Sequence, residues 1–210
     1  MEILYEDREI VVVYKEAGLA AETKKRLEKD LLSLLSAFFY ERDGKLPELH
    51  LIHRLDQPVD GLVLLALTAS SAAVLSKELA EGGMEKMYRA RVEGRIPEER
   101  GELCDYLIRD GRTNTSRTAS PGSRGAKRAL LTYEKKGEDL LFISLKTGRH
   151  HQIRVQLAHA GMPVAGDIKY GASGDKKDRG ILLTAAELSF THPKTGKRMR
   201  FQLPERLLRF

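Results

Sequence analysis

The sequence predicts an α+β fold, in which strands and helices follow one another without a regular alternation. Two observations lead to this prediction. Segments in which apolar and polar side chains alternate, as they do in strands, recur from one end of the chain to the other. Between them lie segments in which leucines recur at three- and four-residue steps, which is typical of amphipathic helices. No internal repeat and no Pro/Gly/Ser-rich linker divides the chain, so we predict a single domain over residues 1–210.

The first half of the chain predicts strands at residues 3–5 and 10–14 around an Asp7-Arg8 turn, with Gly18 ending the second. An amphipathic helix is expected over residues 24–40, ending before Asp43-Gly44. Its apolar face is formed by Leu27, Leu31, Leu34, Leu35 and Phe38. A second helix is expected over residues 70–81, with Ala72, Leu75 and Leu79 turned inward and Gly82-Gly83 as its end.

Later segments predict a strand at residues 86–92, a helix after residue 147 that ends at Gly161, and a hairpin. In that helix, Thr147 or a neighbour is expected as the N-cap, and the apolar stripe is Ile153, Leu157 and Ala160. The hairpin joins residues 188–191 to 199–203 through a turn at 193–196.

Composition limits the classes of function. The 210 residues are 41% hydrophobic, enough for a sizeable core, and carry 36 Lys+Arg against 30 Asp+Glu. This excess, with a sequence pI near 9.4, favours a polyanionic partner but is weak evidence alone. Cys104 is the single cysteine, so no intrachain disulfide is possible, and we expect it to be a small buried residue. No apolar run approaches the roughly 20 residues that span a bilayer, and no leader pattern opens the chain, so we expect a cytoplasmic protein without a membrane partner.

The run His53-Arg54-Leu55-Asp56 follows an apolar approach and precedes a second apolar run, 61–67. If residues 49–56 are extended, Arg54 and Asp56 share one face, and Pro58 with Asp60-Gly61 reverses the chain into a hairpin. Asp56 then lies at the mouth of that hairpin, where chemistry is possible. The alternative is a turn aspartate that binds its own backbone.

Two further segments carry candidate residues. Tyr88 shares a strand face with Ala90 and Val92 and therefore points to an interior or a pocket; a core tyrosine is the alternative. The polar run 147–154 places Arg149 and Arg154 in the first half of a helix, where the helix dipole disfavours cations. This placement indicates an anionic partner, a carboxylate or a phosphate, although an ordinary solvated face is the alternative.

Residues 109–128 hold six cations and one acid, Asp110, among Gly, Ser and Thr, which predicts a flexible cationic loop that contacts nucleic-acid phosphates or is merely solvated. A second basic cluster, Lys194 to Arg200, surrounds the late hairpin turn. The chain has six histidines, but none has dedicated metal-ligand spacing, and phosphate-loop and dinucleotide motifs are absent. Metal catalysis is therefore disfavoured.

Four groups of residues occur in order along nearly the whole chain. They are His53-Arg54-Leu55-Asp56 with Gly61-Leu62; Lys86, Tyr88, Ala90, Val92 and Gly94; Thr147 to Arg154; and Gly161 to Asp167 with Tyr170-Gly171. Together with residues 3–18 and 182–193, they resemble the successive motifs of the RluA-type RNA pseudouridine synthases. The resemblance implies the pseudouridine synthase fold, a mixed and mostly antiparallel sheet flanked by helices and loops, with a central RNA-binding cleft.

The resemblance also implies an isomerase that converts uridine to pseudouridine in structured tRNA or rRNA, with no metal and no organic cofactor, and we expect a monomer. It implies Asp56 as nucleophile, Tyr88 against the target base and Arg154 paired with Asp56; an adjacent guanidinium keeps a buried carboxylate ionised. Because a stacked uridine must be flipped outward, Arg54 is expected to fill the gap it leaves. The expected RNA-binding residues are His53, Arg54, Lys86, Arg149, His151 and Gln152.

The chain departs from that family at two places. Where the family commonly has Thr-Ser before the glycine, this chain has Val59-Asp60, and where it commonly has Lys-Pro, this chain has Lys15-Glu16. Neither change removes an expected catalytic group. The alternative function is a non-catalytic RNA-binding or RNA-remodelling protein that retains this fold, and no base-reading code that would identify the RNA is visible.

Overall fold

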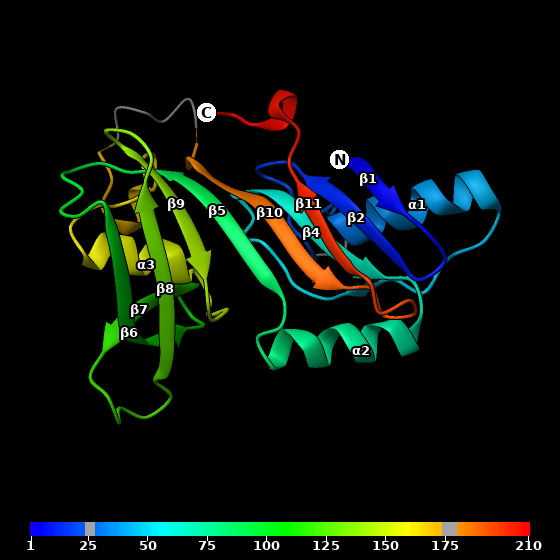
Figure 1. The fold of residues 1–210 in the computed structure, drawn as a ribbon, viewed down its shortest axis with the longest axis horizontal. Helices are drawn as coiled ribbons and strands as arrows, with labels where there is room; N and C mark the ends of the chain where they lie inside the picture. The colour runs from blue at the N-terminus through cyan, green and yellow to red at the C-terminus, as the bar shows by residue number, and fades with distance from the viewer. Residues whose placement is uncertain (24–27, 174–179) are drawn as a thin grey trace. The chain divides into compact units, whose positions relative to one another are not determined.

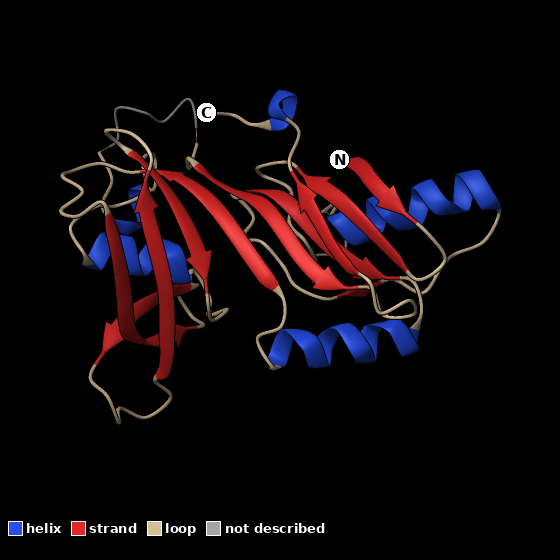
Figure 2. Ribbon diagram, viewed as in Figure 1, coloured by secondary structure: helices blue, strands red, loops and turns tan. Residues whose placement is uncertain are grey.

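The computed structural model describes residues 1–23, 28–173 and 180–210, which form two compact units. The first unit consists of Met1–Glu85 and Ala185–Leu208, and the second of Lys86–Thr184 and Arg209–Phe210. Antiparallel strands dominate both units, and helices are few (Figure 2). The predicted α+β class is confirmed.

The first unit is built around the strands β2 (Ile10–Lys15) and β4 (Asp60–Ala66), whose side chains are all buried. The strand β1 (Glu2–Glu6) pairs with β2, and β2 pairs with β4, both antiparallel. Next to β4 in the sheet is β10 (Leu183–Thr191), which belongs to this unit from Ala185 on. The short β3 (His50–Leu51) also pairs with β4, and β11 (Arg198–Gln202) pairs with β10. The predicted strands at the N-terminus and the late hairpin are confirmed.

Two helices accompany these strands, and a short 3₁₀ turn, η3 (Glu205–Leu207), follows β11. The helix α2 (Ala69–Ala80) places Leu75 in a core cluster with Val12, Leu64 and Phe190, and Leu79 packs against it. The helix α1 (Leu31–Asp43) runs behind the strands in the view of Figure 1. The predicted extent and inward face of the second helix are confirmed.

The prediction for the first helix is only partly right. Asp30 caps its N-terminus by accepting from the Ser33 amide, so α1 begins at Leu31, while Leu27 lies outside the described residues. The helix ends at Asp43, three residues beyond the expected range, and Gly44 in the left-handed conformation closes its C-terminus. The buried stripe is Leu31, Leu35 and Phe39, at steps of four, whereas Phe38 is 38% exposed. The expected stripe is therefore confirmed at Leu31 and Leu35 and wrong at Phe38, where Phe39 is buried instead.

Gly61 marks a close approach of two strands. Its φ is 125°, and a Cβ at this position would lie 2.3 Å from the carbonyl oxygen of Ala185 in β10. Any side chain would push β4 and β10 apart, so only glycine fits between Asp60 and Leu62. The glycine that follows Asp56 in the first motif is thus a packing requirement of the first unit.

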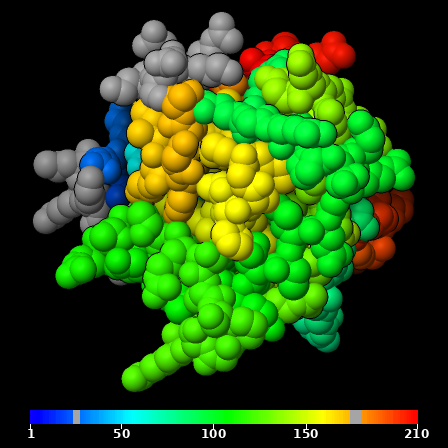
Figure 3. Space-filling view, turned by 90° about the vertical axis from the view of Figure 1, so that its left-hand side faces the viewer, coloured from blue at the N-terminus to red at the C-terminus, as the bar shows by residue number. Residues whose placement is uncertain are grey.

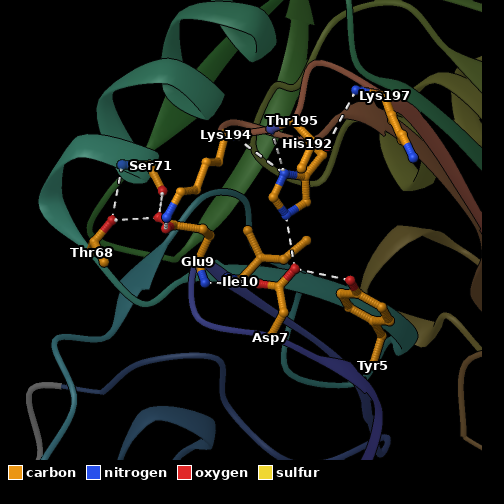
Figure 4. A network of polar contacts seen from close by, with 10 residues as sticks. All are labelled: Tyr5, Asp7, Glu9, Ile10, Thr68, Ser71, His192, Lys194, Thr195 and Lys197. Atoms are coloured by element: carbon orange, nitrogen blue, oxygen red, sulfur yellow. Dashed lines mark hydrogen bonds and ion pairs between the residues drawn. The ribbon is translucent and has the colours of Figure 1, made fainter.

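A polar network joins the turn after β10 to the first hairpin (Figure 4). His192 Nδ1 accepts from the amides of Lys194 and Thr195, so Nε2 carries the proton and donates to Asp7 Oδ2 at 2.8 Å. The other oxygen of Asp7 accepts from the amides of Glu9 and Ile10. Segments 185 residues apart are therefore joined by one carboxylate.

The second unit is an antiparallel sheet in the order β5-β9-β8-β6-β7. Its strands are β5 (Glu85–Arg91, in this unit from Lys86), β6 (Arg100–Asp110), β7 (Thr115–Ala119), β8 (Lys127–Lys135) and β9 (Leu140–Leu145). The helix α3 (Gln152–His159) packs on it, with Val155 against Leu107 and Ala129, and the 3₁₀ turn η1 (Ile168–Tyr170) lies alongside. No described helix is long and apolar enough to cross a membrane.

Four expectations for the second unit are corrected. Residues 109–110, 115–119 and 127–128 belong to β6, β7 and β8, and turns join these strands, so four of the six cations lie on strands and the segment is not one flexible loop. Thr147 does not cap α3, because His151 is the N-cap residue and makes no side-chain cap. Cys104 is exposed on β6 instead of buried. In the stripe of α3, Ile153 and Leu157 are buried, but Ala160 is exposed.

Candidate active site

Asp56 lies in the first unit, in the loop between β3 and β4. The expected strand over residues 49–56 is wrong beyond Leu51, although the hairpin itself is confirmed by the β3–β4 pairing. After Leu51 the chain leaves the sheet: Ile52 and Leu55, three positions apart, are both buried, and Pro58 cannot donate a ladder hydrogen bond. The carbonyl of Asp56 accepts from the Val59 amide at 3.0 Å, and its side chain is partly buried.

The neighbours of Asp56 in the motif have different environments. Arg54 is 54% exposed, and its Nη1 lies 2.6 Å from Glu22 Oε1. His53 is partly buried, and its Nε2 accepts from the amide of Leu64 in β4 at 3.2 Å. That contact assigns the ring proton to Nδ1 and holds the start of the loop on the sheet. A surface arginine and an anchoring histidine therefore precede Asp56.

Sequence reasoning missed Lys15, whose ammonium is buried near the same loop. Its side chain is 0% exposed, and Nζ donates to the carbonyls of Glu16, Leu19 and Gln57. Burial lowers the pKa of Lys15 to about 8, while the negative charges of Asp60 and Asp56 oppose that shift. The signal in the sequence was a lysine that directly continues an apolar strand.

Tyr88 and Lys86 lie on β5, in the second unit. Tyr88 is 7% exposed on the same face as Ala90 and Val92, so the predicted inward orientation is confirmed. Burial lowers the pKa of Lys86, and no hydrogen bond or ion pair of its ammonium occurs among the described residues. A Cβ at Gly148 would lie 3.7 Å from Lys86 Nζ, so this ammonium borders the polar run before α3.

Arg154 projects from α3 and is bound by Asp167, a residue that sequence reasoning did not single out. Its Nε and Nη2 donate to the two carboxylate oxygens at 2.6 and 2.8 Å, and both side chains are almost fully buried. The guanidinium also lies over the ring of Tyr170, 5.0 Å from its centroid. The expected pairing of Arg154 with Asp56, a residue of the first unit, stays a prediction.

The two histidines before α3 form a stacked pair, with ring centroids 3.8 Å apart. His151 has a φ of 52°, the left-handed conformation, and its Nδ1 lies 2.7 Å from the hydroxyl of Tyr170. That hydroxyl also accepts from the Ser116 amide at 2.8 Å, so Tyr170 joins His151 to β7. Burial, assisted by the charge of Arg154, lowers the pKa of His151 to about 3, so the ring stays neutral at physiological pH.

Gln152 organises the same turn through its amide group. Its Oε1 accepts from the Arg149 amide and the Thr147 hydroxyl, and its Nε2 donates to the Leu130 carbonyl. Gln152 is 3% exposed. The loop that carries Arg149 is therefore fixed from inside the second unit, which explains why a glutamine opens this helix.

A polar cavity of about 210 Å³ lies beside this loop in the second unit. It is lined by Leu107, Arg109, Ser116, Gly125, Lys127, Gly148, Arg149 and His150. Three of these residues are cations and none is acidic. Arg149 Nε donates to the Arg128 carbonyl at 2.9 Å, while its two terminal nitrogens make no hydrogen bond among the described residues. Figure 3 shows this face, with the green surface of β6 to β8 beside the yellow surface of α3.

No group of three or more His, Cys, Asp or Glu side chains that would hold a metal occurs in the part of the chain that the structure describes. The candidate residues supply a carboxylate in the first unit, and a tyrosine with several guanidinium and ammonium groups in the second. Such a set is suited to nucleophilic and proton-transfer chemistry on a polyanionic substrate.

Comparison with known proteins identifies the family. Residues 9–159 match the model of the RNA pseudouridylate synthase family. The uncharacterized RNA pseudouridine synthase YhcT of Bacillus subtilis is 30% identical over 97% of this chain and 68% of its own length. The ribosomal large subunit pseudouridine synthase C of Escherichia coli is 33% identical over 96% of this chain and 66% of its own length.

Solved structures agree with the family model. Human RNA pseudouridylate synthase domain containing 1 has a TM-score of 0.75 at 25% identity, covering 97% of this chain and 83% of that one. Human RNA pseudouridylate synthase domain containing 4 has a TM-score of 0.76 at 22% identity, covering 97% and 89%, and shows the common fold. The match over residues 9–159 includes Asp56, Tyr88 and Arg154. The chain therefore belongs to the RluA-type RNA pseudouridine synthases, which are isomerases that act on RNA.

Proposed function

We propose that this enzyme isomerises specific uridines in structured rRNA or tRNA, with Asp56 as the nucleophile. The observation that carries the proposal is that Asp56 belongs to a loop held by the buried ammonium of Lys15, within the segment that matches the family model. A carboxylate on a fixed loop is held in one orientation, as a nucleophile requires.

In the proposed reaction, the bond between C1′ and N1 of uridine breaks and a bond between C1′ and C5 forms. Asp56 assists the detachment of uracil, C5 loses its proton to solvent, and N1 gains one, so atoms balance without an oxidant or co-substrate. Tyr88 lies against the base and assists proton removal at C5, and Arg154 is the counter-ion of Asp56. For this reason we propose that neither a metal nor an organic cofactor takes part.

RNA binding is proposed to use the cationic cavity of the second unit together with Lys86. Arg109, Lys127 and Arg149 surround a space without a carboxylate, and phosphodiester groups supply the missing negative charge. Lys86, whose ammonium is partly buried and has no anionic partner among the described residues, is suited to the same backbone. The name of the relative from Escherichia coli supports rRNA as the substrate class.

The remaining sequence-predicted residues are given separate roles. Arg54 is exposed and belongs to a loop, so we propose that it fills the space left by the flipped uridine. His151 and Gln152 are 7% and 3% exposed, with polar atoms that bind Tyr170, Arg149 and Leu130. We propose that they support RNA binding by fixing Arg149, and that His53 supports the Asp56 loop.

The proposal is tested with RNA labelled with tritium at C5 of uridine. Wild-type protein is expected to release tritium from total RNA of a strain that lacks the enzyme, and Asp56→Asn is expected to release none while binding the RNA as before. Pseudouridine mapping in the two strains then identifies the modified position. If wild-type protein binds RNA but releases no tritium, the chain is a non-catalytic RNA-binding protein with this fold, and the proposal is wrong.

A further inference from the structure

Lys15 is among the largest fully buried side chains in the described part of the chain, and its exposed fraction is 0%. It ends β2 after a run of apolar residues, where a charged group costs free energy unless its donors are bonded and its charge is balanced. A lysine that only continued the strand would turn its ammonium to solvent. The complete burial of the Lys15 ammonium therefore indicates that its positive charge has a functional role.

The three donors of the ammonium are all bonded to main-chain carbonyls. Nζ donates to Leu19 at 2.7 Å, to Glu16 at 3.1 Å and to Gln57 at 3.3 Å. The Gln57 carbonyl also accepts from the Gly18 amide at 2.8 Å, and the Gln57 side chain donates to the Gly18 carbonyl at 3.0 Å. The residue after Asp56 is thus fixed to the turn at 16–19 on both its main-chain and side-chain atoms.

The balancing charge comes from Asp60, the first residue of β4, which is 0% exposed. Lys15 pairs in register with Gly61, the residue after Asp60, and the Tyr14 hydroxyl donates to Asp60 Oδ2 at 3.0 Å. Glu16 is turned away, because its carboxylate binds the amino group of Met1.

We propose that Lys15 and Asp60 together are positioning residues for Asp56: Lys15 fixes the main chain beside the nucleophile, and Asp60 keeps Lys15 charged. The proposal rests on the proposed role of Asp56. It predicts that turnover, but not RNA affinity, depends on the protonation of Lys15. Because the pKa of Lys15 is lowered to about 8, turnover falls as pH rises through this value.

The test is the pH profile of tritium release in wild type and Asp60→Asn. Asp60 raises the pKa of Lys15, so removing its charge lowers that pKa, and the alkaline limb of kcat is expected to move to lower pH. At pH 8, kcat is expected to fall about tenfold while KM for RNA changes less than about twofold. A structural role alone would change the amount of folded protein without moving the limb.

Two further variants guard against loss of folding. Lys15→Met and Asp60→Asn each leave one buried charge unbalanced, so the double variant is expected to have a higher Tm than Lys15→Met alone. Lys77→Met, on the exposed surface of α2, is the matched control and is expected to leave the pH profile and Tm unchanged. A double variant that is less stable than both single variants contradicts the proposed charge balance.

Titration of the Lys15 side chain by NMR gives a readout that needs no catalysis. The pKa of Lys15 is expected to be near 8 in wild type and lower in Asp60→Asn. If wild type turns RNA over and Asp60→Asn keeps the wild-type alkaline limb, the positioning role is overturned. If wild type shows no turnover, the proposed function fails. If the pKa of Lys15 measured by NMR is the same in Asp60→Asn as in wild type, the role of Asp60 is overturned independently of turnover.

Discussion

Arg154 and Asp167 form a bidentate ion pair, with N–O distances of 2.6 and 2.8 Å and side chains that are 4% and 1% exposed. The carboxylate fixes the plane of the guanidinium, and Tyr170 covers its face. A buried arginine could not be held ionised and oriented without such a partner. The geometry of the proposed counter-ion of Asp56 is therefore set within the second unit, by a residue 13 positions further along the chain.

Asp167→Asn is expected to destabilise the protein strongly and to reduce turnover. The change leaves the guanidinium of Arg154 buried without a balancing charge, which costs about 3–5 kcal/mol in the free energy of unfolding. Equilibrium unfolding in urea measures the loss. Asp139→Asn is the matched control, because its partner Arg91 forms an exposed pair with it, and such pairs contribute less than about 1 kcal/mol. Equal effects of the two variants would show that burial of the Arg154 pair is unimportant.

His151→Asn is expected to make folding stability less sensitive to acid. The folded-state pKa is about 3 because the ring is buried and lies near Arg154, while the unfolded-state value is about 6.5. The unfolded chain therefore binds an extra proton below pH 6.5, and wild type loses about 2 kcal/mol from this group between pH 7.5 and pH 5. Asparagine tolerates the left-handed backbone at this position.

The measurement is the free energy of unfolding of both proteins at pH 5, 6 and 7.5. The difference between wild type and His151→Asn is expected to shrink as the pH falls, because only wild type carries the titrating ring. A difference that is constant over this range would mean that His151 titrates alike in the folded and unfolded states.

Removing a cation of the polar cavity is expected to weaken RNA binding in a salt-dependent way. Arg149→Ala and Lys127→Ala each delete one proposed phosphate contact, so the slope of log K against log salt should become shallower by about 0.7–0.9 for each. Lys77→Ala on α2, which carries the same charge on the first unit, is expected to leave the slope unchanged. Filter binding at several salt concentrations checks this, and identical slopes in all variants would exclude the cavity as a phosphate site.

The strands and the motifs could be predicted because each has a local signal. The alternation at Tyr88 and the apolar runs of β2 and β4 follow directly from burial on one or both faces of a sheet. The start of α1 could not be placed by leucine spacing, since a capping aspartate, Asp30, decides it. The end of β3 was missed because Ile52 and Leu55, three positions apart, are both buried, so burial here does not follow the two-residue period of a strand with one buried face.

The supporting groups of the site depend on tertiary contacts that no short pattern contains. Asp167 binds Arg154 only after a helix and a turn bring them together. Lys15 is a charged residue in an apolar run, and only the fold shows that its ammonium reaches the Gln57 carbonyl, 42 residues away. The composition of residues 109–128 predicts a flexible loop, but the pairing of β6 with β7 and with β8 orders most of its cations.

Asp7→Asn is expected to destabilise the first unit above pH 4 and to matter less in acid. Burial opposes ionisation of Asp7, but hydrogen bonds from the amides of Glu9 and Ile10 and from His192 outweigh it, so the pKa of Asp7 is lowered. A carboxyl with a depressed folded-state pKa contributes stability that is present above its unfolded value, about 3.9, and is lost as pH falls through the folded value.

The loss in Asp7→Asn at pH 7 is expected to be about 1–3 kcal/mol, since the amide keeps one acceptor oxygen but loses the charge that binds His192. Glu41→Gln, an exposed carboxylate on α1, is the control and should change stability little. The measurement is the free energy of unfolding of wild type and the variants at pH 7 and pH 3. Because the carboxylate of Asp7 carries the network, the difference between wild type and Asp7→Asn is expected to be smaller at pH 3. A difference of the same size at both values would mean that the ring and the turn are held together by shape and not by the charge on Asp7.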